Sequence, residues 1–119
     1  MVATLFTIGC TNPFANGDCT AVGVPGISAT VVDATTNRAP LAVPVLLIAE
    51  GTYVEEHPTP FARSDPPSYT GAIERPGTYR VVVRAAGYQD YVLENVKVTR
   101  GGRCNALSGV RLTVSLVRM

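Results

Sequence analysis

The sequence predicts an all-β fold, a single antiparallel β-sandwich of about seven strands. Apolar and polar residues alternate over short stretches, turn residues separate these stretches at intervals of roughly 8–12 residues, and no stretch shows helical periodicity. With 119 residues, 46% of them hydrophobic and 16% charged, the chain is long enough for one buried core. We therefore assign residues 19–119 to a sandwich domain and residues 1–18 to a leader remnant and tether.

The first half of the domain contains two predicted strands. Pro25-Gly26 forms a turn, and residues 27–31 then alternate as in a half-buried strand that ends in the turn-forming residues 33–37. Residues 41–49 are continuously apolar, which predicts a strand covered on both faces. Pro44 places that strand at a sheet edge or at a bulge, because proline cannot donate a ladder hydrogen bond.

The stretch 50–68 carries four prolines and the only histidine of the chain, so we expect a long loop there, flanked by a short extension of the preceding strand through Tyr53. Regular alternation returns after it. Residues 78–85 place Tyr79, Val81, Val83 and Ala85 inward and Arg80 and Arg84 outward. The remaining predicted strands of this half cover residues 69–74, 91–100 and 110–116.

The charge of the chain excludes a strongly basic or acidic protein. Ten Lys and Arg residues against nine Asp and Glu residues give a net charge of +1, which indicates neither a nucleic acid nor an acidic partner. Residues 1–59 carry −4 and residues 60–119 carry +5. The arginines of the basic half stand at the polar positions of alternating strands, which favours a solvated sheet face over an anion-binding surface.

The N-terminal residues indicate export. The apolar stretch before Cys10 ends in Thr7-Ile8-Gly9-Cys10, which resembles the lipobox of bacterial lipoproteins, although Thr7 stands where leucine is usual. The polar, turn-rich residues 11–18 follow it like the tether of a lipidated cysteine. The resemblance implies a lipid anchor on Cys10 and a leader that continues upstream. The alternative is an ordinary first strand over residues 2–8 with Cys10 as a buried thiol.

Cys19 and Cys104 flank the predicted strands, where two ends of a sandwich can meet. A disulfide between them would close a loop of about 86 residues and stabilise the fold by up to about 4.6 kcal/mol in the chain-entropy model. It requires an oxidising compartment outside the cytosol. The alternative is a pair of unpaired thiols in a cytosolic protein.

The strands and turns together resemble the carboxypeptidase regulatory-like, or transthyretin-like, β-sandwich domains, and also the collagen-adhesin B-type repeats. The matching stretches include a turn leading into a core strand and an Ala-Gly-Tyr turn whose tyrosine folds back over the core; they are 26–35, Pro40-Leu41, Gly71, 75–81, 85–88 and 96–98. The stretch Arg103-Cys104-Asn105 is similar to small bacterial envelope lipoproteins of this type, which also pair two cysteines. These motifs specify a fold and no chemistry.

The resemblance implies a non-catalytic envelope protein, because the enzymes of this fold need residues that the chain lacks. Hydroxyisourate hydrolases use several histidines and a Tyr-Arg-Gly-Ser ending, whereas this chain has one histidine and ends Leu116-Val117-Arg118-Met119. Intradiol dioxygenases hold iron with two tyrosines and two histidines. We therefore expect no enzyme activity and no cofactor, and a periplasmic or outer-membrane lipoprotein whose partner is an envelope protein or a glycan.

The loop 50–68 contains the residues of two further candidate sites. Glu55, Glu56 and His57 include metal-ligand types, but only Glu55 and His57 can converge on an extended chain, and Asp65 is the only other acid of the loop; a solvated acidic loop is the favoured interpretation. For binding of a peptide or carbohydrate, the candidate residues of the loop are Tyr53, His57, Phe61 and Tyr69. The absence of tryptophan weakens the carbohydrate alternative.

Overall fold

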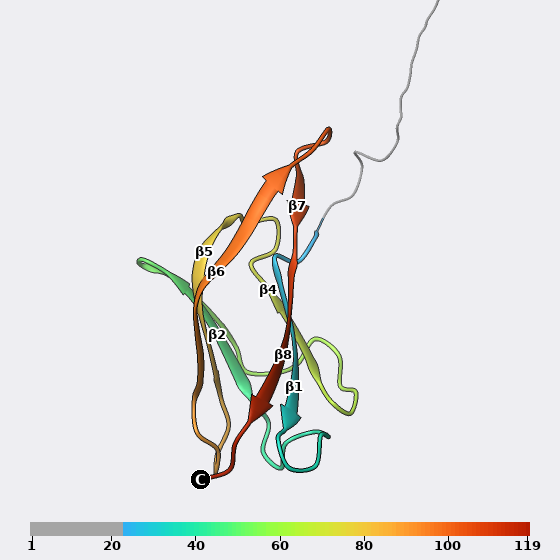
Figure 1. The fold of residues 1–119 in the computed structure, drawn as a ribbon, viewed down its shortest axis with the longest axis vertical. Helices are drawn as coiled ribbons and strands as arrows, with labels where there is room; N and C mark the ends of the chain where they lie inside the picture. The colour runs from blue at the N-terminus through green and yellow to red at the C-terminus, as the bar shows by residue number, and fades with distance from the viewer. Residues whose placement is uncertain (1–22) are drawn as a thin grey trace, which may run out of the picture.

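A computed structural model describes residues 23–119, which form two facing β-sheets without a helix (Figure 1). Cys10, Cys19 and the rest of the predicted leader and tether lie outside the described residues. Within the described part, no helix is long and apolar enough to cross a membrane. The eight strands are β1 (Ile27–Asp33), β2 (Val45–Glu50), β3 (Tyr53–His57), β4 (Ser68–Gly71), β5 (Gly77–Arg84), β6 (Tyr91–Gly101), β7 (Ala106–Ser108) and β8 (Val110–Leu116).

The two sheets have the strand orders β4-β1-β8 and β3-β2-β5-β6-β7. All neighbouring strands pair antiparallel except β1 and β8, which run parallel from the pair Ile27–Val110 to the pair Asp33–Leu116. Figure 1 shows the arrows of β1 and β8 pointing the same way. The prediction of a purely antiparallel sandwich is therefore wrong at this pair. The reason is topological, because β8 follows β7 of the other sheet and is not joined to β1 by a hairpin.

Gly109 marks the point at which the chain passes from one sheet to the other. It separates β7, which pairs with β6, from β8, which pairs with β1. A Cβ at Gly109 would lie 2.7 Å from the carbonyl oxygen of Pro25. The next residue, Val110, donates its N–H to the carbonyl of Gly26 at 2.8 Å. Glycine permits this close approach of the two backbones.

The core lies between the sheets and takes side chains from both. The predicted inward set of β5, Tyr79, Val81 and Val83, is confirmed, since each is at most 1% exposed. The arginines between and after them are exposed and pair with acids of or next to β6: Arg80 with Glu94 and Arg84 with Asp90. Full burial of one such aliphatic side chain stabilises the fold by about 1.5–3 kcal/mol. The other large apolar side chains that are fully buried are Ile27, Val31, Leu46, Ile48, Tyr69, Val114 and Leu116.

The β2–β3 hairpin differs most from the sequence prediction. The predicted strand 41–49 begins only at Val45, since Pro40 and Pro44 have no N–H for a ladder. The chain then turns at Gly51, which has a φ of 58°, and pairs back along β2 over Tyr53–His57. The first part of the predicted loop 50–68 is therefore a strand, and the irregular part is confined to residues 58–67.

Asp33, at the end of β1, is the one buried charged side chain of the described part, with 1% exposure. Its carboxylate accepts hydrogen bonds from the Tyr88 hydroxyl (2.6 Å), Arg118 Nε (2.8 Å), the Thr35 N–H (2.7 Å) and the Thr36 N–H (3.2 Å). The bond from Tyr88 contributes most and, with the others, outweighs the effect of burial, so the pKa of Asp33 lies well below its ordinary range. This network fixes the turn after β1 against the C-terminal residues.

Candidate functional site

The described surface has a groove of about 280 Å³ between two loops. One loop connects β1 to β2 and the other connects β3 to β4 (Figure 1). Apart from Tyr69 in β4, the groove-lining residues therefore belong to the segments after β1 and before β4. Its lining is mostly small and apolar, with four prolines: Ala39, Pro40, Ala42, Val43, Pro44, Thr59, Pro60, Arg63, Ser64, Pro67 and Tyr69.

The wall formed by residues 39–44 is held at three points. The N–H of Ala39 donates to Asp65 Oδ1 at 2.6 Å, and the N–H of Leu41 donates to the Tyr88 hydroxyl at 3.0 Å. At the far end of the wall, the buried Tyr69 hydroxyl donates to the carbonyl of Pro44. These bonds fix a segment that has no strand partner of its own.

Backbone hydrogen bonds between the two ends of the loop hold the wall formed by residues 59–67. The backbone N–H groups of Phe61 and Ala62 donate to the carbonyl of Ser68 at 2.8 and 3.1 Å, and Ser68 donates back to Ala62 at 3.1 Å. An ion pair joins this wall to the end of the β1 turn, since Arg38 donates to Asp65 Oδ2 at 2.7 and 3.2 Å. The Arg38 guanidinium, together with the Ala39 N–H, lowers the pKa of Asp65 from its ordinary value. Both walls are thus preorganised.

Large apolar side chains stand exposed on the two loops. Leu41 is 81% exposed, Phe61 79% and Val43 65%, and among the large apolar residues of the described part only Met119, at the chain end, is more exposed than Leu41. Scattered single apolar residues are common on protein surfaces, but three on adjacent loops around a groove indicate a contact surface. The groove and these three residues are called the loop face below.

The four binding residues predicted for the loop 50–68 do not form one surface. Phe61 belongs to the loop face, but Tyr53 and His57 lie on β3, outside the groove lining. Tyr69 is a core residue with 1% exposure, although it is one of the groove-lining residues. The prediction that Tyr69 offers an exposed aromatic contact is wrong, because alternation along β4 turns its side chain into the core.

Tyr53, Glu55 and His57 share one side of β3, and their side chains contact one another. Glu55 accepts a hydrogen bond from the Tyr53 hydroxyl, and its Oε1 lies 2.8 Å from His57 Nε2. The Ala72 N–H donates to both carboxylate oxygens at 3.1 Å. Although burial opposes its ionisation, these hydrogen bonds together lower the pKa of Glu55. Glu55 and His57, the two residues of this stretch that can converge on an extended chain, thus contact each other.

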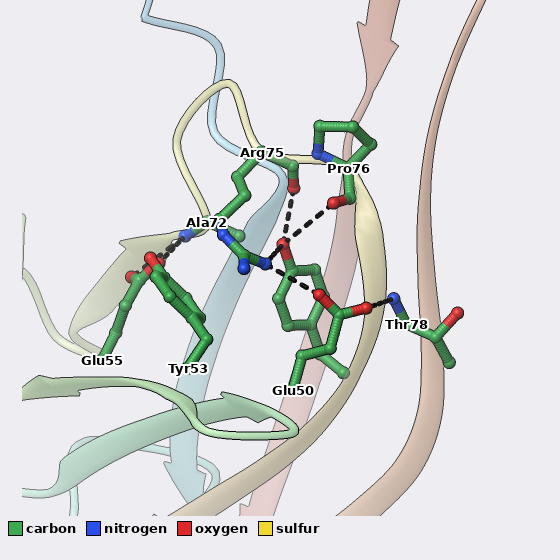
Figure 2. A network of polar contacts seen from close by, with 8 residues as sticks. Glu50, Tyr53, Glu55, Ala72, Arg75, Pro76 and Thr78 are labelled. Carbon is green, nitrogen blue, oxygen red and sulfur yellow. Dashed lines mark hydrogen bonds and ion pairs between the residues drawn. The ribbon is translucent and has the colours of Figure 1, made fainter.

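Figure 2 shows that this cluster continues into a second one around Arg75. The guanidinium carbon of Arg75 lies 3.5 Å from the ring centroid of Tyr53, and Nη1 donates to Glu50 (2.9 Å) and to the Tyr79 hydroxyl (3.0 Å). The Thr78 N–H also donates to Glu50, and this bond, with that from Arg75, lowers the pKa of Glu50. The partners of these side chains come from within the network, which joins the β2–β3 hairpin to the β4–β5 turn.

No group of three or more His, Cys, Asp or Glu side chains that could hold a metal ion occurs within residues 23–119. Asp65, the other acid considered with Glu55 and His57, pairs with Arg38 instead. Cys104 lies half-buried in the turn between β6 and β7. Its predicted partner Cys19, like the predicted lipidation site Cys10, lies outside the described residues, so the disulfide and the anchor stay predictions.

Sequence reasoning missed half of the loop face. Leu41 and Val43 were assigned to a strand because the stretch 41–49 is apolar throughout, and Arg63 was given no role. Pro40 and Pro44, four residues apart, were the available signal that the first part of this stretch could not pair in a sheet. Comparison of the chain with models of known protein families gave no match, and comparison with curated proteins gave none either.

Proposed function

We propose that this chain is an exported, non-catalytic β-sandwich module of a bacterial envelope, anchored by a lipid on Cys10, which binds another protein through the loop face. The observation that carries the proposal is the combination of preorganised walls and exposed apolar side chains in the two loops. Rigid walls reduce the conformational entropy lost on binding. Burial of a side chain such as Leu41, Val43 or Phe61 by a partner would contribute about 1.5–3 kcal/mol.

The polar clusters support a non-catalytic role. His57 is the only histidine of the chain, and its Nε2 contacts Glu55, which also holds Tyr53 and the Ala72 N–H. Arg75 is stacked on Tyr53 and bonded to Glu50 and Tyr79. Side chains that use one another as partners and hold two turns in place are typical of a structural network.

We further propose that the domain is of the transthyretin-like or carboxypeptidase regulatory-like type. Two facing sheets support this, as does the Ala85–Tyr88 turn, in which the Tyr88 N–H donates to Ala85 at 3.1 Å and the ring is 4% exposed. The proposed location rests on the sequence, namely the lipobox-like Thr7–Cys10, the polar residues 11–18, and the pair Cys19 and Cys104.

A protein partner fits the loop face better than a glycan. Sugar-binding surfaces usually stack their ligand on several exposed aromatic rings, whereas the loop face exposes one, Phe61; Tyr69 is buried and its hydroxyl is bonded to Pro44. The surroundings of the groove are apolar, as in the centres of protein interfaces.

The proposal is tested with Val43→Asp and Phe61→Asp, which place a charge on the loop face, and with Ile73→Asp as matched control. Ile73 is 48% exposed in the turn that follows the far end of β4. We expect wild type and the Ile73 variant, extracted from envelopes in mild detergent, to migrate as a complex on native gels. The two loop-face variants should migrate alone. Complexes that persist in both loop-face variants, or wild type migrating alone, would contradict the proposal.

A further inference from the structure

Arg63 carries a charge that the described part of the protein does not neutralise. Six other arginines form ion pairs with carboxylates: Arg38, Arg75, Arg80, Arg84, Arg100 and Arg118. Arg63 is exposed, lines the groove, and makes no hydrogen bond or ion pair with any residue of 23–119. An unpaired guanidinium on a concave surface can bind an anion.

The acid closest to Arg63 in sequence is already engaged. Asp65 accepts two hydrogen bonds from Arg38 and a third from the Ala39 N–H. These bonds occupy both carboxylate oxygens and hold the second wall to the first. The acid of this loop therefore fixes the groove and leaves the positive charge of Arg63 available.

The surroundings of Arg63 suit a ligand that carries both apolar groups and a carboxylate. Pro40, Pro44 and Pro60 with Val43 provide an apolar lining, and Leu41 and Phe61 are exposed beside it. The volume of about 280 Å³ is below the range of roughly 300–1,000 Å³ usual for small-molecule and cofactor pockets and holds only a few side chains. A guanidinium binds a carboxylate through two parallel hydrogen bonds.

We infer that the loop face binds an extended acidic peptide segment, with an Asp or Glu carboxylate on Arg63 and neighbouring apolar or proline side chains against Val43 and the proline-lined wall. This inference rests on the proposed function and adds to it the chemistry of the partner. An extended peptide presents neighbouring side chains in alternate directions, so one segment can fill the apolar groove and place a carboxylate at its edge.

The experiment uses a random peptide library displayed on phage, selected against the purified full chain. We expect the selected peptides to carry Asp or Glu next to apolar residues or proline. Synthetic copies should bind Arg63→Gln about tenfold more weakly or worse, because one charge-assisted interaction is lost. The matched control is Arg111→Gln, since Arg111 is exposed on β8 and likewise has no partner within residues 23–119. This control should leave the affinity unchanged.

Charge reversal gives an independent readout. Selection against Arg63→Glu should yield peptides with Lys or Arg in place of the acids. Raising the salt concentration should weaken binding to wild type more than binding to Arg63→Gln, because salt screens exposed charges.

The outcomes separate the inference from the proposed function. Peptides that bind wild type, fail to bind Val43→Asp, and show neither an acidic residue nor a dependence on Arg63 would overturn the inference and leave a peptide-binding loop face. No selected peptide at all, or peptides that bind Val43→Asp as well as wild type, would contradict both. Binding of acidic oligosaccharides without any selected peptide would overturn the inference in favour of a glycan.

Discussion

The hydroxyl of Tyr88 donates a hydrogen bond of 2.6 Å to the buried carboxylate of Asp33 and thereby joins the β5–β6 turn to the end of β1 in the other sheet. The same hydroxyl accepts the N–H of Leu41 at 3.0 Å, which fixes one wall of the groove. Arg118 reaches Asp33 from the C-terminal end, and the N–H of Met119 donates to Gly87 at 3.0 Å. One end of the sandwich and the loop face therefore depend on a shared network.

Removal of the Tyr88 hydroxyl should destabilise the fold. In Tyr88→Phe, Asp33 loses one donor and the Leu41 N–H loses its acceptor, and we expect the free energy of unfolding to fall by about 1–3 kcal/mol. Urea unfolding measures this change. Tyr91→Phe is the control, since the half-buried Tyr91 hydroxyl has no hydrogen-bond partner within residues 23–119, and it should change the free energy by less than about 0.5 kcal/mol. If both substitutions lowered the free energy of unfolding equally, the stabilising role proposed for the Tyr88 hydroxyl would be contradicted.

The stability should depend on pH through Asp33. Its pKa in the folded protein is lower than its ordinary value of 3.8, so ionised Asp33 stabilises the fold above about pH 4, and this contribution is lost as the pH falls below it. We expect Asp33→Asn to be less stable than wild type at pH 7, and the difference to shrink steadily between pH 5 and pH 2.5. Urea unfolding across this range provides the test, with Glu94→Gln on the exposed Arg80 pair as control. A constant difference between wild type and Asp33→Asn would contradict the account.

Substitution of Gly109 should weaken the passage between the sheets. In Gly109→Ala, the added methyl group meets the backbone oxygen of Pro25, which cannot move without shifting the start of β1, and we expect a loss of about 1–3 kcal/mol. At Gly101 an added Cβ has no heavy atom within 4 Å. Gly101→Ala should therefore be neutral or slightly stabilising. If thermal unfolding shows the same midpoint for both variants, the close contact at Gly109 has no energetic consequence.

The proposed export predicts the mass of the mature protein. Protein recovered from native membranes, with thiols blocked under non-reducing conditions, should begin at Cys10 with acyl chains attached and should contain no blocked thiol. This result would establish the anchor and the Cys19–Cys104 disulfide together. A protein that retains Met1 and carries three blocked thiols would instead indicate the cytosol.

The sequence was sufficient to predict the all-β class and the direction of the β5 side chains, because strict alternation such as Tyr79, Val81 and Val83 depends on local spacing alone. The parallel pairing of β1 and β8 was not predictable in this way. It depends on where the chain re-enters the first sheet after Gly109, which is a long-range property.

The candidate site was predictable only in part. Phe61 was predicted because it is an aromatic residue in a long loop, whereas Val43 lies in an apolar stretch that was predicted to be a strand. Tyr69 was predicted to begin a strand, but which face its side chain takes depends on its pairing with Ala29 in β1, which turns it inward. Arg63 could not be identified as an unpaired charge from the sequence, because only the structure shows that the nearby Asp65 pairs with Arg38.

The most direct test of the loop face as an interaction surface is site-specific photo-cross-linking in intact cells. A photoreactive phenylalanine derivative is placed at position 43 or 61 on the loop face, or at position 73 beyond β4 as control. We predict discrete cross-linked products with an envelope protein from positions 43 and 61 and none from position 73. Products of equal yield from all three positions, or none from positions 43 and 61, would contradict the central claim.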